Sequence, residues 1–151
     1  MSNVIDVQGS DQMGACDPGW MDASFQNMGC LFFENTAMNF EAAIQFCGES
    51  NAHLVEVQTE AQMDFLVMEL QSLETLIGQY NWWGGASDSG REGHWYWQHS
   101  LTDVGTFVWG YNQPDFTYAS NYLAFGYGGE TTYHGWDNSP DMLHNPICQI
   151  L

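Results

Sequence analysis

The chain has 151 residues, of which 44% are hydrophobic and 15% aromatic, enough for one compact domain with a dense core. The chain has nineteen acidic residues and one basic residue, Arg91, which gives a formal net charge of -18. This charge excludes nucleic acid and anionic membranes as partners, because both are bound through Lys and Arg. With this charge, divalent cations, basic proteins and neutral sugars remain as ligands. No run of residues is apolar for long enough to insert across a membrane.

The N-terminal end of the chain carries no periodic pattern. Residues 1–15 mix Ser, Asp, Gly and Gln, which predicts a flexible leader, and a single domain is predicted over residues 16–151. A short aromatic run predicts a strand over 31–34, and Asn39 is placed to cap a helix after it. The apolar face of that helix is predicted to consist of Phe40, Ala43, Ile44 and Cys47.

A second helix is predicted to follow a short strand. Residues 54–57 alternate apolar and polar side chains, as a strand would. Thr59 and Gln62 have the spacing of a capping box, and the helix that they begin is expected to end at Gly78. Its buried stripe is predicted to consist of Met63, Leu66, Val67, Leu70 and Leu73.

The half of the chain beyond the second helix is aromatic, rich in glycine and turns, and without helical periodicity. Residues 111–122 and 126–135 are predicted to form long polar loops, which usually bind a ligand when they are ordered. Two helices followed by strands predict an α+β domain. The strands are predicted around Trp82 and over 95–97, 107–109, 122–125 and 146–150.

The four cysteines form an even set without the two close pairs that a zinc site requires. In a loop-rich chain such a set favours two disulfides. Because disulfides persist in oxidising compartments, we expect a secreted, extracellular protein. The cysteines are Cys16, Cys30, Cys47 and Cys148.

Several short motifs follow one another along the chain. They are Asn81-Trp82-Trp83-Gly84-Gly85, Glu92-Gly93-His94-Trp95-Tyr96-Trp97, Trp109, Gln113-Pro114-Asp115, Trp136-Asp137-Asn138 and Pro146-Ile147-Cys148-Gln149. Together they resemble, in kind and in order, the motifs of the C-type lectin-like domain family, over residues 16–148. The resemblance implies a C-type lectin-like fold, with two helices packed on small antiparallel sheets and a long ligand-binding loop region.

The resemblance also implies how the cysteines pair. Cys47 and Cys148 match the pair that ties the first helix to the last strand in the family. Cys16 and Cys30 match the extra pair of the family's long form, which fixes an N-terminal hairpin. A third disulfide, which clamps the binding loops in the family, has no counterpart in this chain.

The resemblance further implies a Ca²⁺ site that also binds sugar. Gln113 and Asp115 flank Pro114, and a cis peptide bond there would point both side chains to one face. Asp137 and Asn138 would arrive from a neighbouring strand, and oxygen atoms of these types suit the six to eight ligands of calcium. The Gln-Pro-Asp order resembles that of family members that select galactose or N-acetylgalactosamine. The physical reason for this selection is that exchanging amide and acid reverses the pattern of hydrogen-bond donors and acceptors offered to the two sugar hydroxyls.

The sugar-binding surface is predicted to include two aromatic rings that follow the Gln-Pro-Asp motif. Phe116 and Tyr118 could stack on a sugar ring, and they could equally pack within the loop. The family usually has Trp-Asn-Asp where this chain has Trp-Asp-Asn, so the charge is kept while the order of the ligands is exchanged. The strong acidity alone does not identify calcium, since it could serve only solubility.

Three further carboxylates are candidates for an auxiliary calcium site. Asp88 and Glu92 match two of the four ligands that the family uses there, although a solvated acidic turn would have the same pattern. Ser120 stands where the family has a glutamate, and Glu130 is a candidate replacement for the lost carboxylate.

No arrangement of residues predicts an enzyme. The five histidines lack a nucleophile or metal-ligand spacing, and the cysteines are assigned to disulfides. We therefore expect a calcium-dependent carbohydrate-binding lectin in innate recognition or agglutination, the latter requiring a homo-oligomer for avidity. The alternative is a lectin-like scaffold with a degraded sugar site, whose acidic aromatic surface binds a mineral, ice or a protein.

Overall fold

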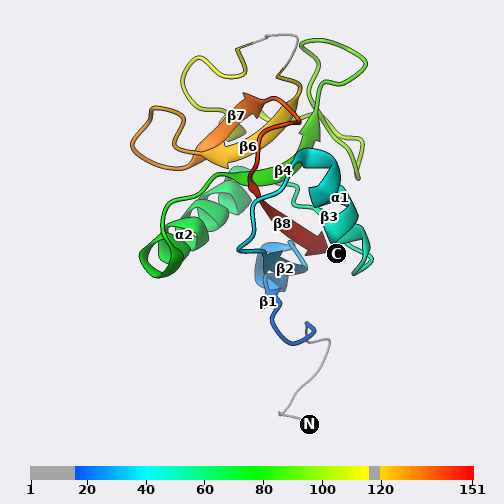
Figure 1. The fold of residues 1–151 in the computed structure, drawn as a ribbon, viewed down its shortest axis with the longest axis vertical. Helices are drawn as coiled ribbons and strands as arrows, with labels where there is room; N and C mark the ends of the chain where they lie inside the picture. Colours follow the sequence, from blue (N-terminus) through cyan, green and yellow to red (C-terminus); the bar gives the residue numbers. More distant parts are fainter. Residues whose placement is uncertain (1–15, 116–119) are drawn as a thin grey trace.

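Two α-helices and eight short strands make up the described part of the chain, which in this computed structural model comprises residues 16–115 and 120–151 (Figure 1). The strands are β1 (Met21–Asp22), β2 (Cys30–Phe33), β3 (His53–Leu54), β4 (Trp82–Ser87), β5 (Tyr96–Trp97), β6 (Tyr122–Gly126), β7 (His134–Asn138) and β8 (Asn145–Ile150). The helices are α1 (Phe40–Gly48), α2 (Glu60–Ile77) and two short 3-10 helices, η2 (Ser24–Gln26) and η3 (Thr106–Val108). The predicted α+β class is confirmed.

The strands join into one sheet in which the last strand is central. The order is β1-β2-β8-β4-β6-β7, with β3 added to β8 and β5 added to β4. β8 is antiparallel to β2 and parallel to β4, whereas the other pairs are antiparallel. β8 therefore connects the N-terminal hairpin with the half of the domain formed by β4, β6 and β7. The long loops extend from that half, away from the N-terminus (Figure 1).

β4 organises the hydrophobic core because side chains on both of its faces are buried. Trp82 and Trp83 are adjacent in the strand, so they point to opposite faces of the sheet. Trp82 belongs to the apolar cluster that includes the buried stripe of α2, and Trp83 to the one that includes α1. A Cβ at Gly85 would lie 2.7 Å from the carbonyl oxygen of Leu54, so glycine allows β3 to lie against β4.

The first helix begins where the sequence predicts. Asn39 caps α1, because its side-chain oxygen accepts a hydrogen bond of 2.8 Å from the backbone N–H of Ala42. Three of the four residues predicted on the apolar face are buried. Ile44 is 43% exposed, contrary to the prediction. It lies about 100° around the helix from Ala43, which turns its side chain to the edge of the buried face.

The second helix confirms the capping-box prediction. Thr59 accepts a hydrogen bond from the backbone N–H of Gln62, and the Gln62 side chain accepts one from the backbone N–H of Thr59. Gly78 forms the C-cap with a φ of 105°, which favours glycine. Of the predicted stripe, Met63, Leu66 and Leu70 are buried, and Val67 and Leu73 are partly buried against the same cluster. No helix within the described residues is long and apolar enough to cross a membrane.

The predicted strand over 54–57 is wrong in its extent and in its alternation. Strand β3 covers only His53–Leu54, and all four residues from 54 to 57 are buried, including Glu56. The Glu56 carboxylate is accommodated because it accepts hydrogen bonds from the backbone N–H groups of His99 (2.7 Å) and Ser100 (3.3 Å). A buried carboxylate therefore anchors the turn after β5.

The predicted strand over 107–109 is also wrong. Residues 106–108 form η3, in which the N–H of Val108 donates to the carbonyl of Gly105 and the N–H of Trp109 donates to that of Thr106. Only Trp109 forms a bridge, parallel to Gly135 of β7. The predicted loop over 126–135 is shorter, because β7 already begins at His134.

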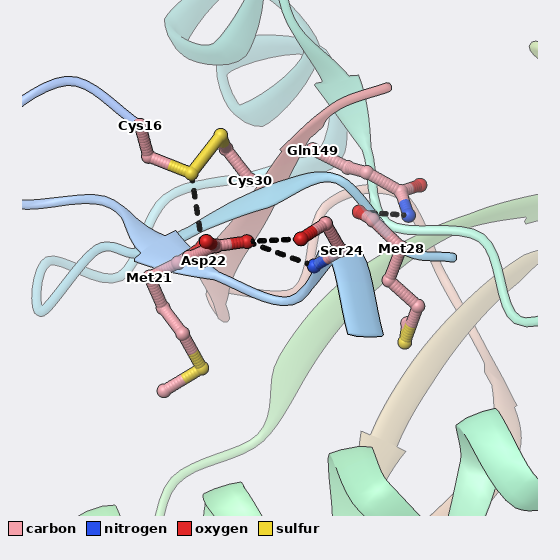
Figure 2. Close-up of a disulfide and its surroundings, with 7 residues drawn as sticks. All are labelled: Cys16, Met21, Asp22, Ser24, Met28, Cys30 and Gln149. Carbon is pink, nitrogen blue, oxygen red and sulfur yellow. Dashed lines mark hydrogen bonds between the residues drawn. A yellow bond between two sulfur atoms is a disulfide. The ribbon is translucent and has the colours of Figure 1, made fainter. Parts of the chain in front are cut away.

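Both cysteine pairs implied by the resemblance are disulfide-bonded. Cys47–Cys148 joins α1 to β8 across 101 residues, and Cys16–Cys30 joins the first described residues to β2. Figure 2 shows the Cys16–Cys30 disulfide beside the turn that follows β1. In this turn Asp22 accepts hydrogen bonds from the N–H and hydroxyl of Ser24. These bonds lower the pKa of Asp22. Nearby, the side-chain amide of Gln149 in β8 donates to the carbonyl of Met28, which holds the hairpin on the sheet (Figure 2).

Candidate functional site

The segment from Trp109 to Asp115 runs beside β7 and brings the Gln-Pro-Asp motif to that strand. The N–H of Gly110 donates to the carbonyl of Gly135 at 3.0 Å, which fixes the start of the segment. The peptide bond between Gln113 and the following proline is cis. From there the segment lies next to the end of β7 that carries the Trp-Asp-Asn motif.

Asp137 is the centre of the candidate site. Its backbone N–H donates to the side-chain oxygen of Gln113 at 3.2 Å, and its Oδ2 accepts from the backbone N–H of Asp115 at 3.0 Å. The residue is only 4% exposed, and its Oδ1 is buried without a hydrogen-bond partner among the described residues. A buried carboxylate oxygen left in this state is costly unless a proton or a cation accompanies it.

The two carboxyl groups of the site influence each other. Burial, as the largest cause, together with the neighbouring side chain and charge of Asp115, raises the pKa of Asp137 to about 7. At neutral pH and without a cation, a negative charge on Asp137 is destabilised by its buried, low-dielectric surroundings and by the like charge of Asp115. The pair therefore favours a divalent cation, which would offset both effects.

Asn138 lies on the other face of the sheet from Asp137, as neighbours in a strand do. Its Nδ2 donates to the carbonyl of Trp136 at 3.2 Å, and its Oδ1 lies 2.7 Å from Nε2 of His144. Since the amide oxygen only accepts, the imidazole nitrogen is the donor, and burial lowers the pKa of His144 to about 4, which keeps it neutral. The side chains of Gln113, Asp115 and Asp137 are thus brought together, while that of Asn138 is turned to His144.

His144 is a participant that the sequence did not indicate, since the histidines have no metal-ligand spacing. It pairs with the β-bridge partner Met38 through two backbone hydrogen bonds and packs against Trp83 at 4.6 Å between ring centroids. The only signal in the sequence was a polar residue between the Trp136-Asp137-Asn138 motif and the Pro146-Ile147-Cys148-Gln149 motif.

The auxiliary pair Asp88 and Glu92 is also close in space. Asp88 is 1% exposed, and its Oδ2 accepts from the backbone N–H of Gly93 at 2.8 Å, while its Oδ1 has no hydrogen-bond partner among the described residues. Desolvation raises the pKa of Glu92, and the charge and side chain of Asp88 raise it further. This pair repeats the arrangement of two facing carboxylates, with Asp88 buried and Glu92 exposed.

The remaining candidates do not join either pair. Glu130 lies in the loop between β6 and β7, at the opposite end of that hairpin from Asp137. The hairpin strands have five residues each, so its two ends are separated by roughly 13 Å. Phe116 and Tyr118 lie outside the described residues.

The donor set of the candidate site fits calcium better than a softer metal. The described residues contain no group of three or more His, Cys, Asp or Glu placed to hold a metal ion. Two carboxylates with an amide oxygen are hard oxygen donors, and backbone carbonyls and water complete the coordination of Ca²⁺ in such sites. Gln113, Asp115 and Asp137 are the side chains that would hold the ion.

Acidification is expected to weaken cation binding at this site. Below about pH 7 the Asp137 carboxyl carries a proton that a cation must displace, so apparent affinity should fall by up to about tenfold per pH unit. Without a cation, the raised pKa makes the folded state bind more protons than the unfolded state, so this group's contribution to stability falls as pH rises from about 4 to about 7. Calcium titrations between about pH 5 and about pH 8 check the first effect; equal affinity throughout would contradict it.

Comparison with known proteins identifies the family of this chain. The sequence model of the family described as "Lectin C-type domain" matches residues 36–148. The chain belongs to this C-type lectin family.

Two relatives from Mus musculus match this chain over only part of their own length. It is 29% identical over 139 residues to CD209 antigen-like protein D of Mus musculus, covering 90% of this chain and 54% of that protein. It is 26% identical over 101 residues to asialoglycoprotein receptor 2 of Mus musculus, covering 66% of this chain and 30% of that protein. The match is therefore to a domain-sized part of each.

Solved structures share the fold. The C-type lectin CEL-I from Cucumaria echinata superimposes with a TM-score of 0.74 at 23% identity, over 90% of this chain and 97% of that one. A Ca²⁺-dependent type II antifreeze protein in its Ca²⁺-free form also gives 0.74, at 24% identity, over 90% of this chain and 100% of that one. At this level of identity the likeness shows the fold alone, and it confirms the predicted C-type lectin-like fold.

Proposed function

We propose that this chain is a calcium-dependent lectin domain that binds galactose-type sugars at Gln113, Asp115 and Asp137. The observation that carries the proposal is the buried Asp137 carboxylate, which faces Asp115 and has one oxygen without a hydrogen-bond partner among the described residues. Membership of the C-type lectin family supports a sugar as the ligand. The activity is recognition rather than catalysis.

The chemistry follows from the donor set. A bound Ca²⁺ supplies a centre to which two vicinal sugar hydroxyls can coordinate. Gln113 offers an amide and Asp115 an acid, so the first residue can donate a hydrogen bond and the second can only accept. This order supports selection of galactose or N-acetylgalactosamine over mannose. The backbone carbonyl of Asn138 is a further candidate ligand for the ion.

The proposal further includes that the protein is secreted, that its domain is of the family's long form, and that it acts as a homo-oligomer. Disulfides at both ends of the domain support an extracellular location. A single small site binds a monosaccharide weakly, so innate recognition or agglutination would require several linked copies of the site.

A second candidate is a lectin-like scaffold whose ligand is a mineral, ice or a protein. It is favoured by Ser120 at the position of the family's glutamate, by the missing loop disulfide and by the net charge of -18. The likeness to an antifreeze protein supports only that the same fold serves such a role elsewhere.

Calorimetry with two successive ligands separates these candidates. We expect heat on adding calcium, and then heat on adding galactose but not mannose. Galactose added before calcium should give no heat. Heat from calcium without heat from any sugar would favour the second candidate and would exclude the first.

A further inference from the structure

A groove of 360 Å³ lies between α2 and the loop that joins β6 to β7. Its walls come from the stretch 63–68 of α2, from Phe107 of η3 and from residues 132–134. None of these described residues belongs to the candidate site. Ligand pockets in proteins typically enclose about 300 to 1,000 Å³, so a groove of this size suits one anchoring group of a partner rather than a large ligand.

Hydrogen bonds hold the loop wall of the groove in place. The side-chain amide of Gln71 on α2 donates to the hydroxyl of Thr132 at 2.9 Å. Nδ1 of His134 donates to the carbonyl of Thr132 at 3.0 Å. Because Thr132 is bonded both to the helix and to the first residue of β7, the groove is formed before a partner binds. A preformed groove lowers the entropic cost of binding.

The apolar side chains of the groove differ in exposure. Met63 and Tyr133 are only 5% and 2% exposed, and Val67 and Phe107 are partly buried against the main hydrophobic cluster. Met68, one turn beyond this base, is 63% exposed. Methionine side chains are unbranched and adapt to the shape of an apolar group. Covering Met68 with such a group would remove apolar surface from water, which favours binding.

Carboxylates continue the groove along α2. Asp64 lines the groove one turn before Met68, Glu60 lies one turn before Asp64, and both acids are exposed. Residues four apart lie on the same side of a helix, about 6 Å apart along its axis. Helix α2 contains no Lys or Arg, and Arg91 is the only such residue in the chain. A partner at this groove therefore meets negative charge that no Lys or Arg of α2 offsets.

We propose that this groove binds a basic amphipathic helix of a partner protein, with an apolar side chain against Met68 and with Lys or Arg facing Asp64 and Glu60. An amphipathic helix places apolar and charged groups one and two turns apart on one side, which matches this spacing. Opposite charges speed the encounter and fix the register, while the buried anchor supplies affinity.

The charge of the chain decides between this partner and a second copy of the same chain. A second copy would bring a further net charge of -18 to the groove, so self-association is opposed by repulsion. A basic partner is attracted by the same charge. The inference goes beyond the proposed function and does not depend on it, because the groove shares no described residue with the candidate site.

The test uses the full chain in the presence of a chelator and a labelled, alanine-based helical peptide. The peptide carries one Leu and two Lys, the Lys four and eight residues from the Leu, and both chain orders are made. One comparison peptide has Ser in place of the Leu, and another has Glu in place of both Lys. Fluorescence anisotropy at low ionic strength should show binding for one order. The Ser peptide should bind about tenfold more weakly, and the Glu peptide should not bind.

Variants of α2 locate the binding. M68S should weaken binding of the Leu peptide at least about fivefold, because the anchor loses its apolar contact. L76S is the matched control, since Leu76 is an exposed residue of α2 outside the groove. Met68 and Leu76 are 63% and 78% exposed, so both variants should fold. D64N should weaken binding about threefold, whereas D141N, at an exposed position outside the groove, should leave it unchanged.

Binding that is equal for the Leu and Ser peptides, or that M68S and L76S weaken equally, would reveal only attraction to the net charge and would overturn the inference. Absence of binding by both Leu peptides would also overturn it. These measurements contain no calcium and no sugar, so either result leaves the proposed function to its own test.

Discussion

Replacing Asp137 by Asn should reduce the affinity for calcium by at least about 100-fold, and sugar binding should disappear with it. The substitution keeps the shape of the side chain, but it removes the charge of the buried carboxylate that faces Asp115. Without calcium, the variant should be at least as stable as the unchanged protein at pH 7, because a like charge and a buried charge are both lost. Isothermal calorimetry measures the affinity, and thermal unfolding in chelator measures the stability.

The matched control is D141N, which removes one negative charge from an exposed position a few residues further along the chain. It should leave calcium affinity within about twofold, because an exposed charge interacts weakly through solvent. If D137N retained calcium affinity, or if both variants lost it equally, the ion would not be held by Asp137.

Removing the Cys47–Cys148 disulfide is expected to have the largest effect on stability. The bond closes a loop of 101 residues, for which loop-closure entropy predicts a stabilisation of about 4 to 5 kcal/mol. A typical domain is stable by only about 5 to 15 kcal/mol, so the C47A/C148A variant should be close to unfolding. Both sulfurs are buried between α1 and β8, and their loss also leaves a small cavity there.

The shorter disulfide supplies the comparison. Cys16–Cys30 spans 14 residues, and its removal in C16A/C30A should cost about 3 kcal/mol. Urea unfolding of both variants at one pH gives the two free energies of unfolding. If the first variant lost less stability than the second, the connection between α1 and β8 would not be a main constraint on the unfolded chain.

The helices were predictable because their signals are local. Asn39, Thr59 and Gln62 form their caps with neighbours three residues away, and Gly78 ends α2 through its own backbone conformation. The disulfide pairing was not local in this sense, and only the resemblance to a family indicated it.

The prediction for residues 54–57 failed because of partners distant in sequence. Glu56 was expected on the polar side of a strand, but backbone N–H groups of His99 and Ser100, more than 40 residues away, make its burial possible. The prediction of a strand over 107–109 failed for a different reason, since residues 106–108 close a 3-10 turn through hydrogen bonds between residues three apart and no periodic pattern indicated it.

The candidate site was predictable as a set of residues but not as a geometry. The motifs name Gln113, Asp115, Asp137 and Asn138 together. Strand alternation, once β7 is recognised, turns Asn138 away from Asp137, and His144 then takes its amide oxygen. Glu130 could not be placed from sequence, because its distance from the site depends on the length of the β6–β7 hairpin.

The most direct measurement of the central claim is retention on an immobilised galactose matrix in millimolar calcium. The account predicts that the protein is retained, that a chelator or free galactose elutes it, and that free mannose elutes it poorly. D137N should pass through unretained, and D141N should behave as the unchanged protein does. Retention that is equal with and without chelator, or no retention with calcium present, would contradict the claim that Asp137 and Asp115 hold an ion that binds the sugar.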